Sequence, residues 1–380
     1  MLQVFQEYEI SQIYAYEFLQ KMALGLISIF MPIYILQTSL GLSWAFNFLI
    51  VEYGAMMLLS FPISYVIAKI GFKHSLVVSY FFYLPAILSL RVFTVTPKVV
   101  ILSGALMAFG KSFHWLALHA EFAVDSQSKT RGKQTGRMLG LPRIARALAP
   151  AIGGALMAYV GFGSLVAVSI FFLGLSAIPL MASRDHRDPM SYSLRGLLER
   201  KHAVLGSLFI LRGVGSATGK YLFPIYVFFI ASGSLDAGIV GSLVNLGSVV
   251  FALSIGHMTD RVNEKKLIVA GTVLSAALFS ARALVGTALQ AYIVSFSAGL
   301  IMMIYFIPVF SDLTDLAEKE DVLEFYAFRE IFLGIGRVAT LIVGLYLING
   351  SQLTALRTTF HIAAAATLLI TFYAGWLSRK

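Results

Sequence analysis

The sequence predicts an all-α integral membrane protein whose twelve transmembrane helices form two pseudo-symmetric bundles of six. Three observations predict this fold: the composition, the spacing of the apolar stretches and an internal repeat. Of the 380 residues, 58% are apolar and 13% are charged, and the mean hydropathy of +0.82 is far from that of soluble proteins. Cysteine is absent, so neither a disulfide framework nor a thiolate metal site is expected.

Twelve stretches of the chain are long enough to cross a membrane, since a spanning helix needs roughly 20 mostly apolar residues. The first half contains stretches at 11–37, 42–68, 74–95, 99–122, 136–160 and 163–183. The second half contains stretches at 202–231, 237–258, 266–288, 290–313, 324–349 and 354–377. The longest polar segment separates the two sets. It predicts one bundle at 1–183, a linker at 184–201 and a second bundle at 202–380.

The second half repeats features of the first. Residues 30–35 (FMPIYI) and 222–227 (LFPIYV) are near-copies that place Pro32 and Pro224 192 positions apart. Three other pairs repeat at nearly the same distance: Glu121 with Asp312, Arg146 with Arg337, and Gly153 with Gly344. Internal duplication of this kind is typical of membrane transporters.

The basic residues predict the orientation of the spans. Lysine and arginine gather in alternate loops, and among the loop residues only Arg91, Lys98 and Arg357 fall in the other set. Cytoplasmic loops carry the excess of positive charge, so both termini are expected in the cytoplasm. The net charge of +10 therefore reflects membrane topology, and no nucleic-acid partner is expected. The short loops favour a bacterial inner membrane.

Two loop motifs carry a resemblance to a known family. Residues 256–261 (GHMTDR), followed by two lysines, are similar to a G-x-x-x-D-R-x-G-R-K loop, and the equivalent first-half loop keeps Gly71 and Lys73 without the aspartate. Residues 130–136 (TRGKQTG) are similar to an R-G-x-x-x-G motif at the start of a fifth span. With these motifs, the repeat and the span count, the chain resembles the major facilitator superfamily over essentially its whole length.

The resemblance implies a transporter that works by alternating access. Spans one, four, seven and ten, with spans two, five, eight and eleven, are then expected to line a central cavity. The resemblance also implies a conformational lock between the two halves, formed by Gly71, Lys73, Gly256, Asp260 and Arg261. For Asp260 and Arg261 a solvated turn remains the alternative.

A proline and glycine segment in the fifth span has two interpretations. Residues 149–154 (APAIGG) are similar to the G-P-x-x-G-G motif of exporters in the family, with alanine at the first position. Small residues let helices approach closely and proline bends a span. The segment is therefore either an exporter signature or a site of plain helix packing.

Charged residues within the spans are the candidate functional residues, because a charge inside the bilayer is costly unless it faces the bundle interior or water. Arg143 and Arg146 lie three apart and share a helix face, and guanidinium groups match carboxylates and phosphates. They either bind an anionic substrate or act as countercharges for Glu52, Glu121 or Glu330. The candidate substrate-binding residues are Arg143, Arg146, Arg212, Arg337, Lys111, His114, Tyr34 and Tyr226.

Proton coupling requires a carboxylate or histidine whose pKa is moved into the working range. Glu17 and Lys21 have the four-residue spacing of a helical ion pair, so Glu17 is either a structural partner or a proton carrier. Glu330 lies seven positions before Arg337 on the same face. His114 either carries a proton or is a satisfied interior side chain. The candidate proton-coupling residues are Glu17, Glu330, Glu52, Glu121 and Asp312.

The motifs of other protein classes are missing from the sequence. It contains no P-loop, no histidine pair with metal spacing and no nucleophile elbow, so an ATPase, an enzyme, a metal centre and a cofactor are not expected. We expect a monomeric, proton-coupled secondary transporter for an anionic or amphipathic small molecule, in contact with membrane lipids and with export by antiport as the favoured direction. A lipid or lysolipid flippase and a non-transporting sensor or assembly protein are the alternatives.

Overall fold

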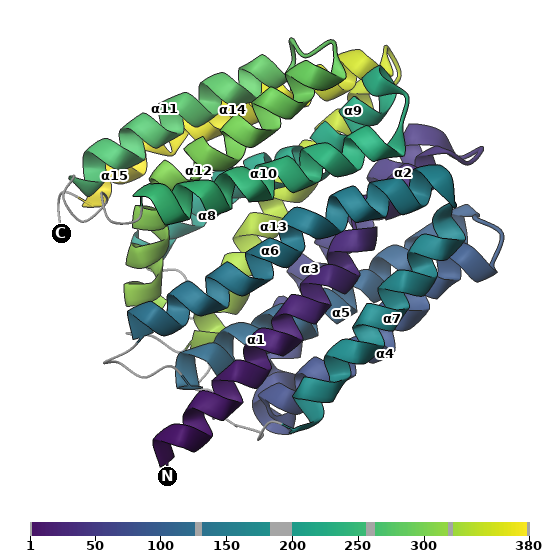
Figure 1. Cartoon of the computed structure of the whole chain (residues 1–380). Helices are drawn as coiled ribbons and strands as arrows, with labels where there is room; N and C mark the ends of the chain where they lie inside the picture. Colours follow the sequence, from purple (N-terminus) through teal and green to yellow (C-terminus); the bar gives the residue numbers. More distant parts are fainter. Residues whose placement is uncertain (1, 126–130, 183–199, 256–262, 318–321, 378–380) are drawn as a thin grey trace.

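The computed structural model describes residues 2–125, 131–182, 200–255, 263–317 and 322–377, which form helices and no strand (Figure 1). The first-half spans are α1 (Leu2–Ile27) with α2 (Phe30–Leu36), α3 (Gly41–Ile70), α4 (Phe72–Val92), α5 (Pro97–Asp125), α6 (Arg131–Tyr159) and α7 (Phe162–Ala182). The second-half spans are α8 (Arg200–Ala217) with the π-helix η2 (Thr218–Leu222) and α9 (Phe223–Ala231), α10 (Ser234–Ile255), α11 (Glu264–Arg282), α12 (Ala288–Ala317), α13 (Val322–Leu347), and α14 (Gln352–Leu369) with α15 (Thr371–Leu377).

Each predicted span overlaps one helix or one interrupted helix, although the ninth span, predicted at 266–288, ends at Arg282. Within the described residues, ten spans are long and apolar enough to cross a membrane. The other two, α6 and α11, are more polar: α6 carries Arg143 and Arg146, and α11 begins with Glu264 and ends with Arg282. The predicted all-α membrane fold is confirmed.

The first and seventh spans lose regular α-helical geometry at equivalent positions. A turn that begins at Ser28 separates α1 from α2, and Lys220, 192 residues later, lies in the π-helix η2. Pro32 lies four residues after Ser28, and Pro224 lies four residues after Lys220. A proline cannot donate the hydrogen bond to the carbonyl four residues earlier, and its ring crowds that carbonyl. The repeated proline therefore explains both irregularities.

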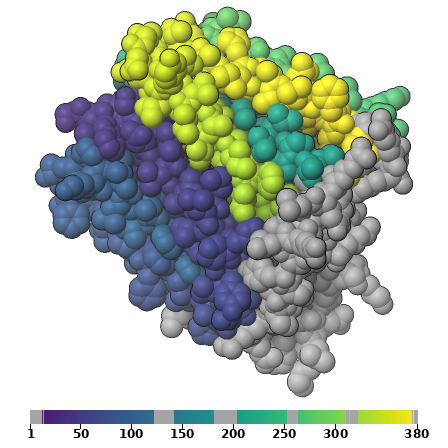
Figure 2. All heavy atoms as spheres, turned by 180° about the vertical axis from the view of Figure 1, so that it is seen from behind, coloured from purple at the N-terminus to yellow at the C-terminus, as the bar shows by residue number. Residues whose placement is uncertain are grey.

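The helices form two groups, α1 to α7 and α8 to α15, as Figure 1 shows. The groups meet mainly along two helix pairs, α6 with α10 and α3 with α13, and Figure 2 shows the second pair side by side. The segment between the groups, 183–199, is outside the described residues. The division into bundles at 1–183 and 202–380 stays a prediction.

Helices α6 and α10 cross at the end of the molecule opposite the chain termini, which we call the far end (Figure 1). A Cβ atom on Gly238 would lie 2.3 Å from the Pro150 carbonyl oxygen and 2.9 Å from the Gly154 Cα, so a glycine is needed for this approach. The Ala151 backbone N–H donates a 2.8 Å hydrogen bond to the Ser242 hydroxyl. Towards the end that carries the termini, α6 and α10 diverge (Figure 1).

Candidate functional site

The first charged cluster joins α1 to α5. Lys21 Nζ lies 3.1 Å from Glu17 Oε2, the ion pair predicted from their spacing. His114 Nε2 lies 3.3 Å from Glu17 Oε1 and 3.1 Å from Lys21 Nζ, and the Tyr16 hydroxyl lies 2.7 Å from His114 Nδ1. All four side chains are buried. We call them the Glu17 cluster, and a proton gained or lost by the acid or the histidine changes the hydrogen bonding of the whole cluster.

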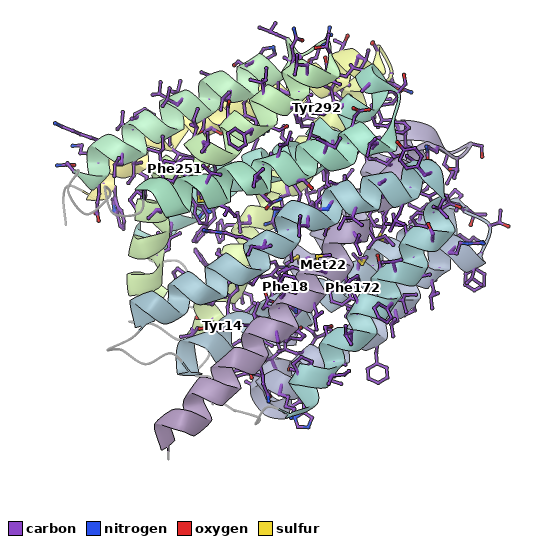
Figure 3. All side chains as sticks on the ribbon, in the orientation of Figure 1. Tyr14, Phe18, Met22, Phe172, Phe251 and Tyr292 are labelled. Carbon is purple, nitrogen blue, oxygen red and sulfur yellow. The ribbon has the colours of Figure 1, made fainter. Side chains whose placement is uncertain are left out.

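An apolar stripe runs along α1 beside the Glu17 cluster. Tyr14, Phe18 and Met22 follow one another along this helix (Figure 3), as side chains four residues apart do. Tyr14 and Met22 are buried, and Phe18 packs against the core. The cluster is thus bordered by apolar surface, where an unpaired charge is costly.

The second cluster connects the two helix groups. Lys111 of α5 forms an ion pair with Glu52 of α3 and donates a 3.2 Å hydrogen bond to the Tyr221 hydroxyl in η2. The Tyr53 and Tyr221 rings meet edge to face, with their centroids 6.0 Å apart. We call Glu52, Lys111 and Tyr221 the Glu52 cluster. It lies next to the Glu17 cluster, because Lys111 and His114 are three residues apart on α5.

The third cluster is centred on Glu330 of α13. Arg337 Nη1 lies 3.1 Å from Glu330 Oε2, which confirms the predicted shared face, and Arg329 Nη2 lies 2.9 Å from Glu330 Oε1. Arg337 Nε donates a 3.1 Å hydrogen bond to the Ser216 hydroxyl. The Arg337 guanidinium also lies 4.8 Å from the centroid of the Tyr53 ring, in the other helix group. We call Ser216, Arg329, Glu330 and Arg337 the Glu330 cluster.

Several interior cations have no acid partner among the described residues. Arg143, Arg146, Arg212 and Lys220 make no ion pair or hydrogen bond with any described residue. The Arg212 guanidinium lies 5.1 Å from the Phe306 ring centroid. Lys220 lies deep among the helices yet its side chain is exposed. The described spans therefore carry a surplus of positive charge, and Lys220 is the exposed part of it.

Two predicted substrate-binding residues lie apart from these clusters. Tyr34 stacks on Phe162 with ring centroids 3.8 Å apart. The Tyr226 hydroxyl donates a 2.6 Å hydrogen bond to the Val285 carbonyl and accepts one of 3.1 Å from Arg357 Nε. These are packing contacts in the segments that follow Pro32 and Pro224. Substrate binding by the two tyrosines stays a prediction.

The other two predicted proton-coupling acids are Glu121 and Asp312. Glu121 is buried in α5 and interacts electrostatically with Tyr16, at the border of the Glu17 cluster. Asp312 belongs to α12, and its side chain is outside the described residues.

Only the first-half copy of the predicted lock is described. Gly71 joins α3 to α4 with a φ of 96°, a conformation that favours glycine, and Lys73 lies in the first turn of α4. Gly256, Asp260 and Arg261 lie outside the described residues. The lock stays a prediction.

The segment 149–154 forms close contacts with both helix groups. A Cβ on Gly153 would lie 2.2 Å from the Leu26 carbonyl oxygen of α1, and a Cβ on Gly154 would lie 2.8 Å from the Ser234 carbonyl oxygen of α10. This geometry supports the packing interpretation of the segment. The exporter interpretation stays a prediction.

Sequence reasoning missed Tyr16, Ser216, Tyr221 and Arg329, which belong to the clusters, and Tyr53 and Lys220, which contact cluster members. Lys220 had a visible signal, because it is a lysine within a span and lies four residues before a repeated proline. Tyr53 and Tyr221 have no such signal. They gain significance only from contacts between the two helix groups.

The apolar helices and the charges between them define a polytopic membrane protein. Residues 205–380 match the family model of the Major Facilitator Superfamily. A comparison with curated proteins gives no match. The matched region is the second helix group, and the first group repeats its sequence features and helix order. The match supports membership of the major facilitator superfamily, whose members move small molecules across membranes.

Proposed function

We propose that this chain is a secondary active transporter that moves a small organic anion by alternating access between its two helix groups. The observation that carries this proposal is the surplus of interior cations. The acids of the three clusters all have cationic partners. Arg146, Arg212 and Lys220 have no acid partner among the described residues. An uncompensated charge inside a membrane protein is costly, so an entering anion is stabilised there.

Proton coupling is assigned to the Glu17 cluster. Glu17 interacts with Lys21 of its own helix α1, with His114 of α5 and with Arg146 of α6. It also interacts electrostatically with the phenols of Tyr80 and Tyr83 on α4. A proton on Glu17 removes the negative charge that faces Arg146. An anion then binds Arg146 more tightly, and by linkage the bound anion favours the proton.

This linkage favours transport of proton and anion in the same direction. Export by antiport is the second candidate, because the segment 149–154 resembles the exporter motif of the family. The two candidates predict opposite signs of proton movement. In co-transport the lumen of a liposome acidifies as the anion enters, and in antiport it becomes more alkaline.

Thermal stability of the purified chain tests the substrate class, because a ligand that binds only the folded state raises stability. The panel contains carboxylates, phosphate esters, lipophilic cations and lysolipids. Stabilisation by anions that is lost in Arg146→Ala supports the proposal, and a pH-sensitive dye in proteoliposomes then gives the sign of coupling. Stabilisation by lipophilic cations or by lysolipids alone overturns it in favour of drug transport or of a flippase. If no compound in the panel raises the thermal stability, a protein that does not transport is favoured.

A further inference from the structure

We propose that the transported anion carries two separated anionic groups and binds with one group on Arg146 and the other on Lys220. This inference rests on the proposed transport of an organic anion and names its class: a dianion that bridges the two helix groups. Arg146 belongs to α6 in the first group, and Lys220 belongs to η2 in the second.

The position of Arg146 is fixed by the crossing of α6 with its neighbours. Arg146, Pro150 and Gly153 are spaced four and three residues apart, so they share a helix face. Pro150 contacts Gly238 of α10, and Gly153 contacts Leu26 of α1. Arg146 therefore lies one turn from this crossing, on the side where α6 and α10 diverge (Figure 1).

The position of Lys220 is fixed by its neighbour in sequence. Tyr221 accepts the hydrogen bond from Lys111, so η2 is held against the first helix group. Lys220 Nζ lies 4.8 Å from the centroid of the Tyr221 ring, and its side chain is exposed. Lys220 interacts electrostatically with Arg146 across the two groups. The two cations thus belong to opposite helix groups and lie close enough to repel each other.

Neither cation is neutralised by the acid with which it interacts electrostatically. Glu17, which faces Arg146, already lies 3.1 Å from Lys21 and 3.3 Å from His114. Glu52, which faces Lys220, forms the ion pair with Lys111. A monoanion satisfies only one of the two free cations and leaves the other uncompensated. A dianion satisfies both and removes the repulsion between them.

The two side chains suit different parts of one ligand. Arginine presents a planar fork that matches a carboxylate or a phosphate, and lysine presents a compact point charge. Dicarboxylates and organic phosphates that carry a carboxylate share the required chemistry. A hydrogen bond to a charged group contributes enough to change affinity by about tenfold or more, so losing one contact is measurable.

The experiment measures thermal shifts of the purified full chain with succinate, glutarate, 3-phosphoglycerate, inorganic phosphate, butyrate and monomethyl succinate. We expect the separated dianions to bind about tenfold or more tightly than butyrate, monomethyl succinate and phosphate. Tighter binding of succinate or glutarate indicates a dicarboxylate substrate, and tighter binding of 3-phosphoglycerate indicates an organic phosphate that carries a carboxylate. In Arg146→Gln and in Lys220→Gln, the affinity for a dianion should fall to the affinity for its half ester. Lys98→Gln removes an exposed cation from the first turn of α5 and should change nothing.

Three results overturn the inference in different ways. If succinate and monomethyl succinate bind equally well and both lose affinity in Arg146→Gln, the ligand does not bridge Arg146 and Lys220. The proposed anion transport is then unaffected. Tightest binding of inorganic phosphate replaces the bridge by a single compact site. No binding of any anion to the wild-type chain removes the proposed function as well. If Arg146→Gln does not fold, Arg146→Lys keeps the charge, and the Lys220→Gln result still decides the question.

Discussion

Lys111 of α5 and Tyr221 of η2 are joined across the two helix groups by a 3.2 Å hydrogen bond. The same lysine forms an ion pair with Glu52 within its own group. A contact that must break when the groups move apart stabilises the conformation in which it is present. The Glu52 cluster is therefore expected to influence the balance between conformations.

Tyr221→Phe tests this influence by removing the hydroxyl alone. A hydrogen bond to a charged group contributes about 1.5–3 kcal/mol, which corresponds to a shift of roughly tenfold or more in the balance. The chain contains no cysteine, so Ser242→Cys at the far-end crossing supplies a single labelling site. We expect a membrane-impermeant maleimide to label this site faster in Tyr221→Phe. The exposed Tyr346→Phe is the control, and equal labelling rates in all three proteins would contradict the prediction.

Two buried cations should respond oppositely to the same substitution. Lys111→Met leaves Glu52 buried without its partner, and breaking a buried ion pair costs about 3–5 kcal/mol. Arg282 is 4% exposed, lies between the Phe223 and Phe279 rings, and has Nε and Nη1 without hydrogen-bond partners. Arg282→Met removes an uncompensated charge, and we expect it to be neutral or stabilising.

Thermal unfolding of the three purified proteins in one detergent measures this contrast. Lys111→Met should unfold well below the wild-type temperature, and Arg282→Met at or above it. A large loss of stability in Arg282→Met would show that this guanidinium has a partner in the native protein.

The far-end crossing should fail when a side chain is added to Gly238. Its Cβ would lie 2.3 Å from the Pro150 carbonyl oxygen, so Gly238→Leu forces α6 and α10 apart. Gly174 of α7 is a matched control, because a Cβ there would meet nothing within 4 Å. We expect Gly238→Leu to lose most transport and to expose Ser242→Cys to maleimide, and Gly174→Leu to behave like the wild type. Full activity in Gly238→Leu would mean that this close contact is dispensable.

The sequence predicts the features that depend on local periodicity. The spans, the Glu17–Lys21 pair and the shared face of Glu330 and Arg337 follow from helical spacing and are present in the structure. The contact between Lys111 and Tyr221 could not be predicted, because it depends on how two separate helix groups dock.

The repeat of Tyr34 and Tyr226 predicts a shared environment. Tyr34 stacks on Phe162 and the Tyr226 hydroxyl donates to the Val285 carbonyl, and their role in substrate binding stays a prediction. Conversely, Lys220 has no charged counterpart at Ser28, so comparison of the two halves gives it no weight. Its importance comes from being exposed deep among the helices.

Glu17→Gln should remove the dependence of transport on pH. Glu17 contacts both Lys21 and His114, and the amide keeps the size and part of the hydrogen bonding without the exchangeable charge. When one proton is linked to anion binding, affinity changes by about a factor of ten per pH unit within the titration range. We expect that slope to fall to about zero in Glu17→Gln, measured as anion affinity across a pH series. Glu264→Gln changes an exposed acid at the start of α11 and should keep the wild-type slope. An unchanged slope in Glu17→Gln that disappears in Glu330→Gln would transfer the role to the Glu330 cluster, because Glu330 is the buried acid paired with Arg337 in the other helix group.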